Sequence, residues 1–106
     1  MIMEIEITDQ NYAEIIKSAP VVLIDFWAPW CGPCRSLAPT VAEIAIQYEG
    51  RVVVAKCNVD ECDDVPAECG IRSIPTLIYY KDGQVADRSV GAVPKSDIEG
   101  RLKALL

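Results

Sequence analysis

The sequence predicts an α/β domain in which helices cover both faces of a central mixed β-sheet. Two observations lead to this prediction. Segments with strand-like and helix-like hydrophobic patterns follow one another in the order βαβαβαββα, and two of the strand-like segments are apolar almost throughout, which is typical of strands inside a sheet. The 106 residues fit one domain spanning residues 1–106. Their apolar fraction of 51% is sufficient for a core without metal or disulfide support.

The N-terminal segment is expected to form a strand, a helix and a second strand. Residues 3–7, "MEIEI", alternate between polar and apolar side chains, as a short strand does. Thr8 can cap a following helix, which must end before Pro20 because the residue that precedes a proline disfavours helical geometry. Residues 21–28, "VVLIDFWA", are too continuously apolar for an exposed strand, so we place them at the centre of the sheet.

A long helix is expected after residue 31, followed by another central strand. One face of the helix is apolar at helical spacing, through Leu37, Val41, Ile44, Ala45 and Tyr48. Gly50 suits the end of this helix, and Pro39 lies inside it, where it should produce a kink. The strand covers residues 51–59, "RVVVAKCNV".

The C-terminal part is expected to contain a short helix, a hairpin and a last helix. Residues 60–70, "DECDDVPAECG", form a loop with a helix after Asp64 that ends at Gly70. The segments "TLIYY" and "QVADRSV" flank "KDG", which predicts a β-hairpin over residues 76–90. Pro94 opens the last helix. One side of that helix is apolar, through Ile98, Leu102 and Leu105.

Composition excludes several classes of function. The net charge of −6 argues against nucleic-acid binding, which requires a basic face. The absence of histidine excludes Cys–His and Ser–His catalytic pairs and Cys₂His₂ zinc sites. Five cysteines, an odd number, argue against a fully paired secreted framework. No apolar run reaches the roughly 18 residues of a membrane helix, and the N-terminus lacks the basic region of a signal peptide, so we expect a cytoplasmic protein that does not bind membranes.

The stretch "WCGPC" carries the clearest chemistry. Cys31 follows a strand and Cys34 falls in the first turn of a helix, where free backbone N–H groups and the helix dipole favour the thiolate form. Pro33 suits that turn. Cys31 is the expected exposed nucleophile, and Cys34 the buried resolving thiol. Two alternatives are half of a Cys₄ zinc site, which needs a second close cysteine pair, and an inert structural disulfide, which a cytoplasmic location disfavours.

Several segments together resemble the thioredoxin family. They are "DFWAPWCGPC", "VAKCNVD", "GIRSIPT", "YKDGQV" and the dipeptide Val90-Gly91, and they occur in the family's order and spacing across nearly the whole chain. The resemblance implies the thioredoxin fold and the activity of a general protein-disulfide reductase. Gly32 and Pro33 between the cysteines resemble the reducing members of the superfamily, near the potential of about −270 mV that characterises thioredoxins themselves.

The resemblance also implies a mechanism. Cys31 attacks a client disulfide, and Cys34 then attacks Cys31 and releases the reduced client. Asp25 would accept the proton of Cys34, because burial in an apolar strand raises the pKa of a carboxyl group toward neutrality. Lys56 matches the family lysine that neighbours this aspartate and lowers its pKa. The structural alternative is a buried Asp25–Lys56 ion pair without a catalytic role.

A docking surface for clients follows from the same resemblance. Pro75 matches a proline with a cis peptide bond that lies opposite the cysteines, although the sequence alone favours trans. Ile74 would pair its backbone with an extended client segment. Trp30, Gly91 and Ala92 would complete a flat apolar platform together with Gly32 and Pro33. The alternative for Trp30 is a place in the core; Trp27 is expected to be structural.

Three further cysteines depart from the many family members that have only the active pair. Cys57 should face away from Lys56 and form a buried, inert thiol. Cys62 and Cys69 resemble a non-catalytic pair of animal thioredoxins that can form a regulatory disulfide. A fully helical spacer would hold their Cα atoms ~10 Å apart, beyond the ~7 Å limit for a disulfide, so pairing requires unwinding. Two unreactive thiols are the alternative, favoured by the nearby acidic residues, which should raise the thiol pKa values.

The predicted partners are disulfide-containing clients and thioredoxin reductase, which would supply electrons from NADPH, with no bound cofactor or metal and a monomeric chain. Two other functions remain open. The chain can serve as a dedicated electron donor to one client enzyme, or as a binding or chaperone subunit whose cysteines are incidental.

Overall fold

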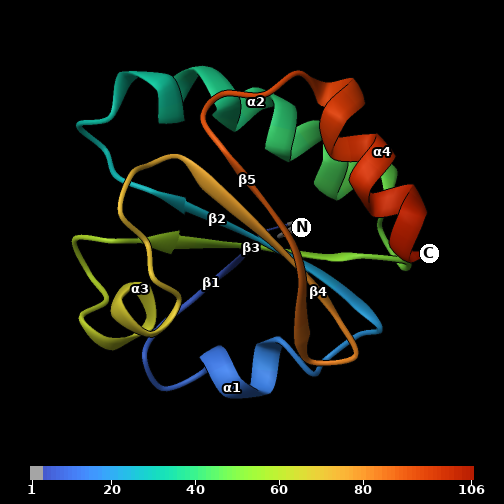
Figure 1. The fold of residues 1–106 in the computed structure, drawn as a ribbon, viewed down its shortest axis with the longest axis horizontal. Coiled ribbons are helices and arrows are strands. Elements are labelled where there is room, and N and C mark those ends of the chain that lie inside the picture. Colours follow the sequence, from blue (N-terminus) through green and yellow to red (C-terminus); the bar gives the residue numbers. More distant parts are fainter. Residues whose placement is uncertain (1–3) are drawn as a thin grey trace.

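The computed structural model describes residues 4–106 and contains one five-stranded sheet (Figure 1). The strands are β1 (Glu4–Glu6), β2 (Val21–Trp27), β3 (Val53–Asn58), β4 (Thr76–Lys81) and β5 (Gln84–Val90). The helices are α1 (Tyr12–Ile15), α2 (Gly32–Gln47), α3 (Asp64–Glu68) and α4 (Lys95–Leu105). This order confirms the predicted βαβαβαββα arrangement; the first residue of the predicted strand 3–7 lies outside the described part.

The sheet is mixed, as predicted, with the spatial order β1-β3-β2-β4-β5. The first three strands in this order are parallel, and both β2–β4 and β4–β5 are antiparallel. Helices α2 and α4 cover one face, and α1 and α3 lie on the other (Figure 1). The central position of β2 explains its continuous apolar sequence, because its side chains enter a covered core on either face.

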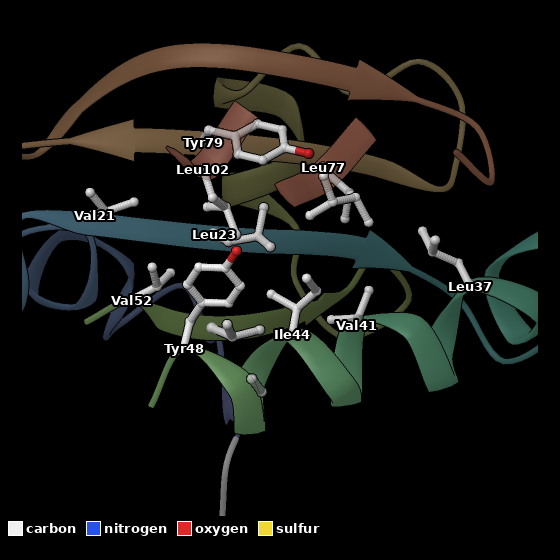
Figure 2. Close-up of a cluster of buried hydrophobic side chains, with 13 residues drawn as sticks. Val21, Leu23, Leu37, Val41, Ile44, Tyr48, Val52, Leu77, Tyr79 and Leu102 are labelled. Carbon is white, nitrogen blue, oxygen red and sulfur yellow. The ribbon is translucent and has the colours of Figure 1, made fainter. Parts of the chain in front are cut away.

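Each face of the sheet has its own apolar core. Val21 and Leu23 of β2 point toward α2 and α4, where they meet Ile44, Leu77 and other side chains (Figure 2). The intervening residues of β2 belong to the core on the opposite face: Val22, Ile24 and Phe26. Asp25 follows the alternation and therefore projects to the same face as Leu23, toward the layer that contains α2.

Local sequence features act largely as predicted. The Thr8 hydroxyl accepts the Asn11 N–H at 3.1 Å, and the Asn11 side chain accepts the Thr8 N–H at 2.8 Å, so Thr8 caps the turn that leads into α1. Helix α2 continues through Pro39. The hairpin turn places Asp82 and Gly83 at φ of 51° and 81°, the left-handed pair that a two-residue hairpin requires.

One capping interaction joins distant parts of the chain. The carboxylate of Asp9 accepts the backbone N–H groups of Asp63, Asp64 and Val65 at 3.0, 3.2 and 3.0 Å, so it caps α3 from the β1–α1 connection. Asp63, which immediately precedes α3, makes no side-chain capping bond. The backbone donors, with Val65 the largest contributor, lower the pKa of Asp9.

Replacing Asp9 with alanine is expected to lower the melting temperature by several degrees at pH 7, because three backbone donors lose their acceptor. The folded-state pKa of Asp9 is depressed, so its contribution is complete above the ordinary pKa of an aspartate and is lost as pH falls through the folded-state value. The difference from wild type should therefore shrink in acid. Thermal unfolding of Asp9→Ala beside Asp63→Ala measures this; equal effects of the two substitutions would contradict the assignment.

Candidate active site at the start of helix α2

The cysteine pair lies between the end of β2 and the first turn of α2. Cys31 is the extended residue that caps the helix, and Cys31 and Cys34 form a disulfide with Cα atoms 5.2 Å apart. The Cys34 N–H donates to Cys31 Sγ at 3.1 Å. Gly32 and Pro33 form the exposed connection between the cysteines. The helix therefore directs a free N–H, and the positive end of its dipole, at the Cys31 sulfur.

The predicted contrast between an exposed Cys31 and a buried Cys34 is small in this disulfide form. The exposed fractions of the two residues are 5% and 3%. Cys31 Sγ also lies 3.8 Å from the carbonyl oxygen of Ile74, which covers it from the opposite loop. Because the two sulfurs are bonded to each other and packed against that loop, neither is freely presented to solvent.

Asp25 is the buried ionisable group of this region. Only 1% of the residue is exposed, and its Oδ1 has no hydrogen-bond partner among residues 4–106. Burial raises the pKa of Asp25 to about 7, the nearby positive charge of Lys56 partly offsets this rise, and Glu4 adds to it. A carboxyl group with such a pKa exchanges protons near neutral pH, as the sequence predicted.

Lys56 neighbours Asp25 in the β2–β3 register, but the two side chains do not form an ion pair within 4.0 Å. The Lys56 ammonium instead lies 4.4 Å from the centroid of the Trp27 ring. The alternative, a buried salt bridge between Asp25 and Lys56, is therefore wrong, because the two charged groups are too far apart to form one. Lys56 acts on Asp25 through the electrostatic field of its positive charge, and Trp27 holds the ammonium in place.

Ile74, one of the predicted docking residues, packs against the cysteines. The Ile74–Pro75 peptide bond is cis, as the resemblance implied, and the Gly91 N–H donates to the Pro75 carbonyl at 2.8 Å. Ala92, next in the chain, is exposed. Trp30 is 67% exposed, so its alternative placement in the core is wrong.

Several residues near this surface were not predicted from the sequence. The Trp30 indole N–H donates to the Asp60 carboxylate at 3.0 Å. A pocket of about 390 Å³ adjoins Trp30 and Ile74 and is completed by Val59, Pro66, Ile71, Arg72 and Ser73. No periodicity or spacing in the sequence links these residues, because they come from helix α3 and from three separate connections around the sheet.

The other cysteines lie on the opposite face of the sheet. Cys57 is fully buried, and burial together with the neighbouring Cys62 thiol raises its pKa. It packs on the α1/α3 side, which confirms that it faces away from Lys56. Cys57 is thus positioned as the unreactive thiol that the sequence predicted.

Cys62 and Cys69 are free thiols with separate partners. Cys62 precedes α3 and donates to the Ile7 carbonyl at 3.3 Å, whereas Cys69 follows α3 and donates to the Tyr12 hydroxyl at 3.4 Å. The pKa of Cys62 is raised chiefly by burial, with Asp9, Glu61 and Asp63 adding to the effect. A regulatory disulfide between Cys62 and Cys69 stays a prediction.

A cysteine pair of this spacing, at the N-terminus of a helix that leaves the centre of a mixed sheet, defines a dithiol–disulfide oxidoreductase site. The family model for Thioredoxin matches residues 3–104. The chain is 52% identical over 99 residues to Thioredoxin 1 of Nostoc sp., covering 92% of both chains. It is 50% identical over 102 residues to a thioredoxin of Synechocystis sp. and 43% identical over 95 residues to one of Haemophilus influenzae, covering 95% and 89% of both chains. The chain belongs to the thioredoxin family.

Membership of this family identifies the activity as that of a general disulfide reductase. Its partners are proteins that contain disulfides. Thioredoxins require no bound cofactor. Residues 4–106 contain no cluster of three or more Cys, Asp or Glu side chains placed to hold a metal ion. Within the same residues, no helix has the length and apolarity needed to cross a membrane.

The ionisation of buried Asp25 should make the protein less stable as pH rises. Its folded-state pKa of about 7 exceeds the ordinary value of 3.8, so the carboxyl is protonated in both the folded and the unfolded protein below about pH 4. Above pH 7 it must be ionised in the folded protein, which costs about 4 kcal/mol at ~1.4 kcal/mol per pKa unit. Asp25→Asn should therefore raise the free energy of unfolding at pH 8 far more than at pH 4.

Guanidinium unfolding of the oxidised protein between pH 4 and pH 8 measures this difference. Asp82→Asn, in the exposed hairpin turn, is the matched control and should leave the pH dependence unchanged. A stabilisation by Asp25→Asn that is the same at both pH values would contradict the assignment, because it would not arise from ionisation.

Proposed function

We propose that this chain reduces disulfides in many client proteins through a Cys31/Cys34 exchange cycle in which Asp25 accepts the proton of Cys34. The observation that supports this most directly is the disulfide at the start of α2, with its Cys34 N–H directed at Cys31 Sγ. The buried and unpartnered carboxyl of Asp25 lies on the sheet face that α2 covers. Redox and proton-transfer groups thus share one end of the domain.

The first step forms a mixed disulfide. In the reduced protein the Cys31 thiolate, stabilised by the Cys34 N–H and the helix dipole, attacks one sulfur of the client disulfide. A Cys31–client bond forms, the client S–S bond breaks, and the second client sulfur leaves as a thiolate that takes a proton from water. Gly32 and Pro33 hold the two cysteines close and keep their connection exposed to the client.

The second step resolves the mixed disulfide. Cys34 gives its proton to the Asp25 carboxylate and attacks Cys31 Sγ as a thiolate. The Cys31–Cys34 bond forms and the bond to the client breaks, so the client leaves with both sulfurs reduced. Lys56 moderates the proton affinity of Asp25, so that the carboxyl is partly ionised at neutral pH and still basic enough to accept a proton.

The client is expected to bind across the loops beside Cys31. An extended client segment would pair its backbone with Ile74, while Trp30, Pro75, Gly91 and Ala92 present the apolar platform. The exposed Trp30 and the pocket of about 390 Å³ beside it support this placement. Recognition by backbone and general apolar contact suits a reductase with many clients.

The cycle requires an electron supply, because each turnover leaves Cys31 and Cys34 oxidised. We place thioredoxin reductase in this role, with NADPH as the source of electrons, and the protein acts as a monomeric electron carrier in the cytoplasm. The family membership and the histidine-free "CGPC" sequence support the reducing direction.

Asp25→Asn should slow the resolving step at least several-fold at pH 7 and cause mixed disulfides to accumulate, since Cys34 loses its proton acceptor. Single-turnover reduction of a disulfide client, quenched by acid and resolved by mass, measures both quantities. In the wild type the rate of this step should rise as pH increases through about 7, the pKa of Asp25. Equal single-turnover rates for the two proteins would remove Asp25 from the mechanism.

The equilibrium potential of the Cys31–Cys34 couple should lie near the value that characterises thioredoxins, about −270 mV. Titration against glutathione in a Cys62→Ser/Cys69→Ser background, with thiols counted by mass, isolates this couple. A potential above about −200 mV would instead indicate disulfide formation or isomerisation, the activities of the oxidising members of the superfamily.

A further inference from the structure

Two buried carboxylate oxygens lack hydrogen-bond partners. They are Asp25 Oδ1 and Glu4 Oε1. Within residues 4–106, these are the buried side-chain oxygen or nitrogen atoms that have no hydrogen-bond partner. A buried polar atom without a partner carries a desolvation cost, so each such atom in a folded protein calls for an explanation. The mechanism above uses Asp25 and leaves Glu4 unexplained.

The strand register places both carboxyl groups on one face of the sheet. Glu6 of β1 pairs with Lys56 of β3, which in turn pairs with Asp25 of β2. Glu4 lies two residues before Glu6 and therefore projects from the same face. Neighbouring strands lie ~4.8 Å apart, so β3 alone, with Lys56, separates the strand of Glu4 from the strand of Asp25.

A pocket of about 200 Å³ opens at this edge of the sheet. Its lining includes Glu4, Trp27, Lys56 and Asn58, and neither active-site cysteine belongs to it. Solvent can therefore approach Glu4 and the Lys56 side chain from a direction that a client docked over Cys31 does not cover.

We propose that Glu4 is a positioning residue through which the buried Asp25 exchanges its proton with solvent. The inference rests on the proposed role of Asp25 as proton acceptor. In the resolving step the proton of Cys34 passes to Asp25; it then leaves by way of the Glu4 carboxylate and the pocket to water, and Asp25 returns to its ionised form. The client covers the cysteines during this step, so a separate proton exit allows Asp25 to return to its ionised form before the client has left the surface.

The electrostatics agree with this path. The negative charge of Glu4 raises the pKa of Asp25 and that of Lys56 lowers it, so the two groups act in opposite directions on one carboxyl. The strand register places Lys56 of β3 and the apolar Leu77 of β4 beside Asp25, and the charges that act on its pKa are those of Lys56 and Glu4. Loss of the charge at Glu4 should therefore shift the titration of Asp25 toward acid.

The test compares Glu4→Gln with Glu14→Gln, which removes the same charge from exposed helix α1 on the opposite face. Carbon-13 NMR follows the titration of the Asp25 carboxyl, and single-turnover kinetics from pH 5 to pH 9 follow the resolving step. Glu4→Gln should move both midpoints to lower pH and slow the plateau rate several-fold. Glu14→Gln should match the wild type, and Glu4→Asp should recover part of the rate because it keeps the charge.

A double substitution separates this inference from the mechanism on which it rests. In an Asp25→Asn background, Glu4→Gln should cause no further loss, since Glu4 acts through Asp25. Unchanged midpoints in Glu4→Gln, or equal shifts in Glu14→Gln, overturn the role of Glu4 while the Asp25 mechanism stands. If Asp25→Asn itself leaves the resolving rate unchanged, the mechanism is wrong, and the role of Glu4 falls with it.

Discussion

The structure depends on β2 being buried on both faces. This strand supplies alternate side chains to the two cores and leads directly into α2, so the cysteine pair is attached to a strand that is buried on both faces. The same constraint isolates Asp25 from water, because its position in the alternation directs it to the covered face. One element thus sets the position of the thiols and the acidity of the group proposed to serve them.

The environment of Asp25 reflects a balance of opposing effects. Burial raises its pKa, Lys56 lowers it and Glu4 raises it, and the result is a carboxyl that titrates near neutrality. Trp27 contributes indirectly, because its ring holds the Lys56 ammonium at 4.4 Å and outside ion-pair distance of the carboxylate. A direct salt bridge would keep Asp25 ionised and weaken it as a proton acceptor. The arrangement therefore lowers stability at neutral pH, and it keeps the carboxyl able to accept a proton in the role proposed for it.

The opposite face of the sheet is organised around α3. Asp9 caps α3, the Tyr12 and Tyr80 hydroxyls lie 2.8 Å apart, and the Cys69 thiol donates to Tyr12. Burial raises the pKa of Tyr12 to about 12. The three additional cysteines thus pack on this face of the sheet, in a cluster separate from that of the active pair.

By itself, the sequence determined the order of the strands and helices, the hairpin turn at Asp82-Gly83, the central strands and the redox pair Cys31–Cys34, because hydrophobic period, turn chemistry and cysteine spacing are local properties of a chain. The cis bond before Pro75 and the role of Asp25 came from the resemblance to a family, since neither follows from composition or period. Only the tertiary structure decided that Lys56 contacts Trp27, that Trp30 bonds to Asp60, that Asp9 caps α3 and that Glu4 lies on the face of Asp25. These relations join residues from separate strands and loops, and their distances exist only after the sheet has assembled in the order β1-β3-β2-β4-β5.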